Sequence, residues 1–190
     1  MAGVMARHEI RIAGFGGQGV ILAGMVLGRA ATIYEGRHVT LTQSFGPEAR
    51  GSAASVDLIV ASEPVLYPYL TEPDILVAMS QEAYTRFVAA LKPQGLLLYE
   101  QDLVSCEPAR CDLRALGVPA TRLAEELGRK LVLNMVLVGF LTGVTGLVSA
   151  EAVQKSIADS VPKGTESLNT SAFHRGLDYA AALQPAAISK

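Results

Sequence analysis

Short apolar runs alternate with amphipathic segments over the first half of the chain. Apolar runs bounded by turn residues predict strands, and apolar positions recurring every three to four residues predict helices. Helices are expected over 20–35 and 81–91. The expected strands cover 8–13, 38–42, 53–62, 75–79 and 95–100. This alternation is typical of a three-layer, Rossmann-like α/β domain with a mostly parallel central sheet, with any antiparallel strands at its edges.

The C-terminal third changes to a helical pattern. The expected helices cover 122–127, 131–142, 150–160 and 169–183, and Ser149 is a plausible N-cap for the third of them. The run 131–150 carries no charge and is long enough to span a membrane. Asn134, Thr142 and a turn-like second half favour a buried core helix, so we expect no membrane span.

Length and composition limit the class of protein. A chain of 190 residues accommodates one well-filled core, so we expect a single domain over 1–190. Half of the residues are hydrophobic and only 18% are charged, which favours a surface covered by a partner. The net charge of −2, without a basic cluster, gives no electrostatic basis for binding nucleic acid. No signal peptide is recognisable before Arg7, so a cytoplasmic location is expected.

The cysteines and histidines are too few and too scattered for a metal centre. The chain has two cysteines, Cys106 and Cys111, and three histidines, His8, His38 and His174. This set cannot complete a zinc or iron–sulfur site within the chain, so free, reduced thiols are expected.

The sequence GFGGQG at 14–19 follows the first expected strand directly. Gly14, Gly16 and Gly19 fit the G-x-G-x-x-G turn, in which backbone N–H groups approach a diphosphate at a helix N-terminus. Glycines at such a turn also permit tight packing of a strand against a helix without any ligand. The pattern alone leaves both interpretations open.

A dinucleotide site of the ordinary kind is disfavoured. Such sites place Asp or Glu at the end of the second strand, where it binds the adenosine ribose, and this position holds Thr42 or Gln43. Glu35 lies at the wrong end of that strand, and Arg50, the nearby cation, lies on a loop. No Gly-Lys-Ser/Thr follows the glycines, so the P-loop reading fails as well.

Two long motifs together carry a family resemblance. The stretches GFGGQGVILAG at 14–24 and TQSFGPEARGS at 42–52 resemble the gamma subunit of 2-oxoacid:ferredoxin oxidoreductases. The resemblance continues through 74–84, 91–104 and 119–143 and so covers most of the chain. The second motif of the family usually ends Arg-Gly-Gly, whereas this chain has Ser52 at the last position.

The resemblance implies that this chain is one subunit of a multi-subunit enzyme and that the chain alone is inactive. Such an enzyme decarboxylates a 2-oxoacid oxidatively on thiamine diphosphate and forms an acyl-coenzyme A. Its electrons pass through a 4Fe-4S cluster to ferredoxin. Thiamine diphosphate, magnesium and the cluster belong to the alpha and beta partners, and a ferredoxin-like subunit is a further possible partner. No cofactor is expected to be bound tightly by this chain alone, and the second motif favours the 2-oxoglutarate branch over the pyruvate branch.

The resemblance also assigns coenzyme A as a ligand that this chain shares with its partners. The candidate binding residues are Gly14, Gly16, Gly17, Gln18, Gly19, Arg50 and Gly51. The glycines would present N–H groups to a phosphate, and the side-chain amide of Gln18 would donate to the same anion. The fork of donors on Arg50 suits a phosphate or carboxylate.

Simpler roles stay open for each of these residues. The glycines can serve packing alone, Gln18 can face solvent, and Arg50 can pair with Glu48 or with an acid of a partner. Asn134 is interpreted as a satisfied buried amide or a helix-contact residue, with a ligand role as the alternative. The competing hypothesis for the whole chain is an autonomous Rossmann-type NAD(P)-binding module or oxidoreductase.

Overall fold

The computed structural model describes residues 7–46, 53–106 and 110–187. Its strands are β1 (Arg7–Phe15), β2 (His38–Phe45), β3 (Ala53–Ala61), β4 (Ile75–Ala78), β5 (Leu96–Glu100) and β6 (Arg114–Val118). Its α-helices are α1 (Val20–Arg29), α2 (Gln81–Phe87), α3 (Ala120–Glu126), α4 (Leu133–Thr145), α5 (Ala150–Ser160) and α6 (Glu166–Ala187). A π-helix (η1, Ala30–Tyr34) extends α1, and 3-10 turns (η2, Val88–Ala90; η4, Lys130–Val132) follow α2 and precede α4.

The strands form one sheet in the order β2-β3-β1-β4-β5-β6. β1, β4, β5 and β6 are parallel neighbours, whereas β3 is antiparallel to both β1 and β2. The predicted α/β class with a mostly parallel sheet is therefore confirmed. Antiparallel pairing occurs at one edge of the sheet, as expected, because the edge strand β2 pairs antiparallel with β3. The strand that runs against all the others is β3, which inserts between β1 and β2. The short connection from β2 to β3 allows only a hairpin, which makes the two strands antiparallel.

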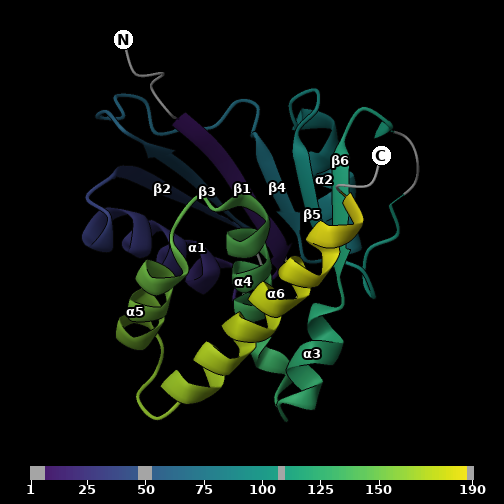
Figure 1. Ribbon diagram of the computed structural model, residues 1–190. Coiled ribbons are helices and arrows are strands. Elements are labelled where there is room, and N and C mark those ends of the chain that lie inside the picture. Colours follow the sequence, from purple (N-terminus) through teal and green to yellow (C-terminus); the bar gives the residue numbers. More distant parts are fainter. Residues whose placement is uncertain (1–6, 47–52, 107–109, 188–190) are drawn as a thin grey trace.

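Helices cover the two faces of the sheet unequally. Figure 1 shows α4, α5 and α6 in front of the sheet and α2 behind it. One hydrophobic core joins β1, β3 and β4 to α1, α4, α5 and α6, and a smaller core joins β4 and β5 to α2. The three predicted layers are present, with most of the helical mass on one face.

The uncharged run near the C-terminal third forms the central core helix. All residues of α4 from Leu133 to Thr142 are buried, because the helix lies between the sheet and α6. The two helices cross where glycines replace side chains. A Cβ on Gly139 would lie 1.9 Å from the Phe173 carbonyl oxygen, and one on Gly176 would lie 2.0 Å from the Val136 oxygen. No helix in the described ranges is both long and apolar enough to cross a membrane.

Candidate functional site

The glycine loop lies at the reversal point of the sheet. β1 ends at Phe15, and the chain passes through 16–19 into α1, which packs on one face and leads to β2. β4 lies on the other side of β1. The chain passes from β4 through α2, which packs on the opposite face of the sheet, into β5. The carboxyl ends of β1 and β4 thus flank a topological switch point, where open α/β sheets bind their ligands.

Two of the glycines adopt backbone conformations that other residues rarely adopt. Gly17 has φ 100° and Gly19 has φ 73°, whereas Gly16 has no positive φ. Gly19 is the N-cap of α1, and its carbonyl oxygen accepts the first helical hydrogen bond, from Ala23 N at 3.0 Å. A Cβ on Gly17 would meet no atom of the described residues within 4 Å. The loop is therefore open to an approaching group at Gly17.

Among the described residues, no side chain caps the N-terminus of α1. Gly19 supplies no side-chain acceptor, and the first turn contains no acidic residue. By contrast, Ser80 caps α2 through Ala83 N, and Ser149 caps α5 through Ala152 N. The N–H groups of the first turn of α1 precede its first internal bond, and the helix dipole adds partial positive charge. This end of α1 is suited to an anion.

Gly14 and Gln18 hold the loop in place from beneath. The Gln18 Oε1 atom accepts a hydrogen bond from Phe15 N at 2.7 Å, and its Nε2 atom donates to the Met79 carbonyl oxygen at 3.0 Å. A Cβ on Gly14 would lie 2.5 Å from that Oε1 atom and 2.8 Å from Met79 Cβ. Gly14 therefore permits close packing, and the amide of Gln18 links the ends of β1 and β4.

Asn134 reaches the loop from α4. It is 2% exposed, and its Nδ2 atom donates to the Gly19 carbonyl oxygen at 3.2 Å. Its Oδ1 atom is buried and finds no hydrogen-bond partner in the part of the chain that the structure describes. A single neutral hydrogen bond contributes about 0.5–1.5 kcal/mol, whereas an unsatisfied buried acceptor costs about 1–3 kcal/mol. The prediction that Asn134 is a satisfied buried amide was therefore wrong for half of its side chain, whereas the alternative of a helix-contact residue agrees with its hydrogen bond to the N-cap of α1.

Two predicted residues, Arg50 and Gly51, lie outside the described residues. The strand residues on either side of this connection lie beside the glycine loop, because Phe15 pairs with Ala53 and Phe45 pairs with Ala54. The side chain of Phe45 is 66% exposed. These pairings also bear on dinucleotide binding, since the strand next to β1 presents Ala53 and Ala54 beside the loop and no carboxylate for a ribose.

A buried carboxylate that the sequence analysis did not single out ends β5. Glu100 is 0% exposed, and its two oxygens accept hydrogen bonds from Asp102 N at 2.8 Å and from both N and Oγ1 of Thr121 at 2.6 Å. The carboxylate thereby fixes the start of α3 to the end of β5. The signal for it was an acidic residue that directly follows the apolar run 96–99.

The described cysteines show no sign of a metal site. Among the described residues, no group of three or more His, Cys, Asp or Glu side chains could hold a metal ion. Cys106 is partly buried and Cys111 is exposed. Burial raises the pKa of the Cys106 thiol, while a hydrogen bond with Tyr99 acts in the opposite direction.

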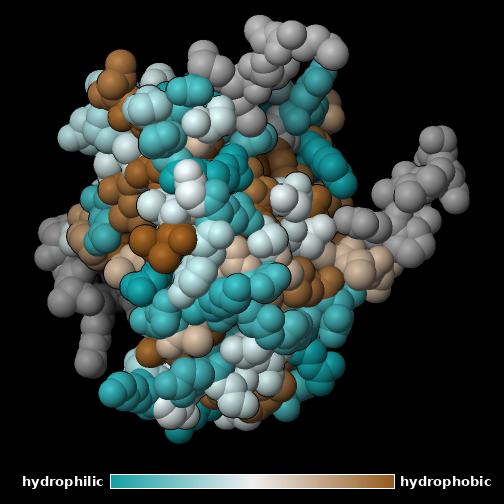
Figure 2. Space-filling model, turned by 60° about the vertical axis from the view of Figure 1, so that its left-hand side comes forward, coloured by the Kyte–Doolittle hydropathy of each residue, from teal (hydrophilic) through white to brown (hydrophobic). Residues whose placement is uncertain are grey.

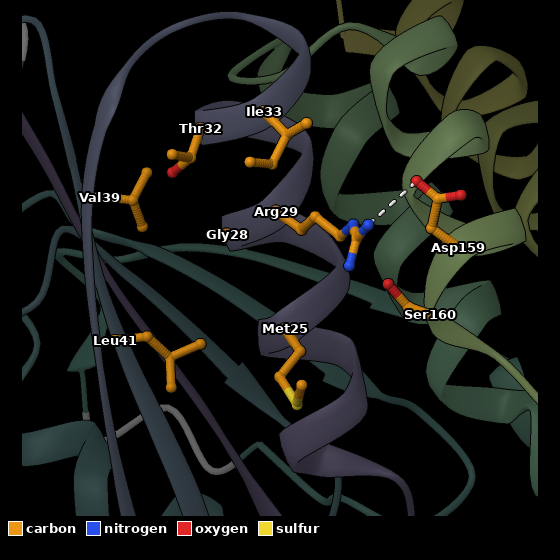
Figure 3. A pocket seen from close by; sticks show the side chains of 9 residues that line it. All are labelled: Met25, Gly28, Arg29, Thr32, Ile33, Val39, Leu41, Asp159 and Ser160. Carbon is orange, nitrogen blue, oxygen red and sulfur yellow. Dashed lines mark hydrogen bonds and ion pairs between the residues drawn. The ribbon is translucent and has the colours of Figure 1, made fainter.

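A shallow groove lies on the far side of α1 from the sheet centre. Its volume is about 580 Å³, and Figure 3 shows its lining by Met25, Gly28, Arg29, Thr32, Ile33, Val39, Leu41, Asp159 and Ser160. Met25 and Ile33 are 50% and 63% exposed, and Arg29 pairs with Asp159 at 3.3 Å. Figure 2 brings this side forward and shows hydrophobic patches among polar ones. The groove is apart from the glycine loop and contains none of the predicted site residues.

Sequence comparisons with known proteins point to the same family as the two motifs. The family model described as pyruvate ferredoxin/flavodoxin oxidoreductase matches residues 9–179. The chain is 46% identical over 179 residues to the 2-oxoglutarate synthase subunit KorC of Methanocaldococcus jannaschii, with 93% of this chain and 96% of the relative covered.

Solved structures extend the likeness to the fold. The keto/oxoacid ferredoxin oxidoreductase gamma subunit from Geobacter sulfurreducens PCA matches with a TM-score of 0.82 and 38% identity, covering 92% of this chain and 99% of that one. The 2-oxoglutarate:ferredoxin oxidoreductase from Magnetococcus marinus, with 2-oxoglutarate, coenzyme A and succinyl-CoA bound, matches with a TM-score of 0.81. That match has 24% identity and covers 93% of this chain and 31% of the other, so it concerns the fold alone.

Proposed function

Because the chain belongs to the pyruvate ferredoxin/flavodoxin oxidoreductase family, we propose that it is the gamma subunit of a 2-oxoglutarate:ferredoxin oxidoreductase. Similarity over nearly the full length of a 2-oxoglutarate synthase subunit supports both the subunit and the substrate. The assembled enzyme would decarboxylate 2-oxoglutarate oxidatively and form its acyl-coenzyme A. Residues 1–190 would act in it as one domain.

The redox chemistry of this complex is assigned to its other subunits. Alpha and beta partners would hold thiamine diphosphate, magnesium and the 4Fe-4S cluster, and ferredoxin would accept the electrons, directly or through a ferredoxin-like subunit. These assignments rest on the family resemblance. The contribution of this chain is assembly together with part of the coenzyme A site.

The observation that carries the coenzyme A proposal is the uncapped N-terminus of α1 at the switch point. Coenzyme A carries phosphate groups, and backbone N–H groups at a helix N-terminus are a recurrent phosphate site. Gly16 and Gly17 would supply the close backbone approach, and Gly17 is open on its Cβ side. Gly19 would contribute as the N-cap of α1, because its own Cβ side is occupied by Asn134. Gly14 and Gln18 would support the loop rather than touch the ligand.

Arg50 and Gly51 belong to the same proposal. The strand ends on either side of their connection lie beside the loop, so a guanidinium from this connection would complete the site with a planar fork of donors. An ammonium cannot reproduce two parallel N–H bonds. Replacement of Arg50 by Lys in the complex should therefore already raise the Michaelis constant for coenzyme A.

The subunit role is tested by reconstitution. The isolated chain, supplied with thiamine diphosphate, magnesium, 2-oxoglutarate, coenzyme A and a dye acceptor, should give no turnover, whereas addition of its alpha and beta partners should restore it. Turnover by the chain alone would contradict the proposal. So would purification from the native cell as a monomer that retains NAD(P).

The ligand role is tested by a paired glycine substitution in the reconstituted complex. Gly17→Ala places a methyl group in the open side of the loop, and we expect the Michaelis constant for coenzyme A to rise about tenfold, equivalent to about 1.4 kcal/mol. Gly164→Ala is the matched control, because Gly164 also has a positive φ, 86°, and no atom within 4 Å of its Cβ position, but lies between α5 and α6. If both variants change the Michaelis constant for coenzyme A equally, the glycines of the loop serve packing and do not bind the ligand.

A further inference from the structure

Asn134 is an amide placed where stability does not favour one. It is the second residue of α4, in a helix whose other residues from Leu133 to Leu141 are apolar and buried. Within the described ranges its side chain makes one hydrogen bond, to Gly19, and this bond does not outweigh the cost of the unsatisfied Oδ1 atom. An apolar side chain of similar shape would avoid that cost, so the amide calls for another role.

The contact between Asn134 and Gly19 is close and specific. A Cβ on Gly19 would lie 2.4 Å from Asn134 Nδ2 and 2.8 Å from its Cγ, so the amide packs directly against the glycine. The Gly19 carbonyl oxygen receives two donors, Ala23 N at 3.0 Å and Asn134 Nδ2 at 3.2 Å. One donor belongs to α1 and the other to α4, and together they fix the direction of this carbonyl.

That direction also determines where a neighbouring N–H group points. The Gly19 carbonyl and the Val20 N–H belong to the same planar peptide unit and point in opposite directions. A carbonyl held along α1 and toward Asn134 therefore directs the Val20 N–H away from the helix body. Val20 is the first residue of α1; the residue as a whole is 2% exposed, and its N–H has no acceptor within the helix.

We propose that Asn134 is a positioning residue for the phosphate site of coenzyme A. It holds the Gly19–Val20 peptide so that the first N–H of α1 points at the bound phosphate, and it does not touch the ligand itself. The inference rests on the proposed function, since it assumes that coenzyme A binds at the glycine loop.

The test compares variants of α4 in the reconstituted complex. Asn134→Leu removes the donor and the unsatisfied acceptor with little change in volume, and Asn134→Ser is a smaller second variant in case the first fails to assemble. Thr142→Val is the matched control. The Thr142 Oγ1 atom is likewise buried with no hydrogen-bond partner among the described residues, but it lies two turns further along the same helix. The readouts are the Michaelis constants for coenzyme A and 2-oxoglutarate, the turnover number at saturating coenzyme A, and the melting temperature.

For an Asn134 variant we expect a rise of about five- to tenfold in the Michaelis constant for coenzyme A, with that for 2-oxoglutarate within about twofold and the melting temperature unchanged or higher. Thr142→Val should leave both constants unchanged. If Gly17→Ala raises the coenzyme A constant and the Asn134 variants do not, the positioning role is wrong while the loop site stands. If none of these variants affects coenzyme A, the loop site itself is wrong. If the Michaelis constants for coenzyme A and 2-oxoglutarate rise equally and the melting temperature falls, Asn134 has only a structural role.

Discussion

The crossing of α4 and α6 gives a stability prediction in which two effects of one substitution compete. Gly139→Ala gains about 1 kcal/mol of helix propensity. It also places a methyl carbon 1.9 Å from the Phe173 carbonyl oxygen and 2.9 Å from its carbonyl carbon. These are backbone atoms of a neighbouring helix, so no flexible side chain can move aside. The helices must separate by about 1 Å across a close-packed core, and overpacking of this kind costs about 1–3 kcal/mol or more.

The cost of the clash should exceed the gain in helix propensity, because helices cannot separate at one point without loosening the contacts on either side. Phe140 and Phe173 are fully buried at this crossing. We expect a net loss of about 2 kcal/mol, which for a domain of this size lowers the melting temperature by about 4–8 °C.

Gly28→Ala is the control, since it makes the same substitution inside α1. Its nearest contact would be Leu58 Cδ2 at 3.4 Å, an ordinary van der Waals distance. This variant should gain about 0.5–1 kcal/mol and melt slightly above the wild type. Thermal unfolding followed by circular dichroism measures both. A Gly139→Ala variant that melts at or above Gly28→Ala would refute the reasoning.

Three further predictions concern charged and ionisable groups. Glu100→Gln should lower the free energy of unfolding by about 2 kcal/mol, because the buried carboxylate accepts three hydrogen bonds and an amide nitrogen cannot accept any; a value within 0.5 kcal/mol, on the order of a surface change, would contradict this. A double-mutant cycle on Arg11 and Asp57, whose two contacts are both 2.7 Å and whose side chains are 14% and 16% exposed, should give a coupling of about 1 kcal/mol or more, above the median of exposed pairs. Iodoacetamide at pH 8 should label Cys111 before Cys106, because burial raises the pKa of the Cys106 thiol; equal rates by mass spectrometry would refute it. The stability that this raised pKa contributes is complete below the pKa of the unfolded thiol and is lost as pH rises through the folded value.

The hydrophobic pattern predicted the elements that are long or fully buried. β4 and β5 follow the expected apolar runs closely, and the expected helix 20–35 exists as α1 continued by the π-helix η1. β6 was missed, because its sequence RALGV is short, contains a glycine, and lies at an exposed edge where no alternation marks it. The position of β3 was missed for another reason. The order of strands depends on which edges pair, and the pattern along one strand does not encode this.

The same distinction applies to the candidate site. Glycine spacing predicted the turn; of its three motif positions only Gly19 has a positive φ, and the other positive φ in the loop is at Gly17. The amide of Gln18 was expected at the anion, whereas the structure places its hydrogen bonds within the loop support. The contact between Asn134 and Gly19 joins residues 115 positions apart. Only the packing of α4 against the loop brings them together, so no local motif could have predicted it.

That packing joins the core to the loop through one helix. Asn134 and Gly139 are five positions apart on α4, so they lie on different sides of it, one against the loop and the other against α6. A displacement of α4 at the crossing would move Asn134 relative to the Gly19 carbonyl. Gly139→Ala should therefore raise the Michaelis constant for coenzyme A more than a substitution of equal thermodynamic cost outside α4. Glu100→Gln supplies that comparison, because its expected cost is similar and its contacts are with the turn after β5 and the start of α3. If both variants in the reconstituted complex change the coenzyme A constant equally, the loop responds to stability in general and not to the position of α4.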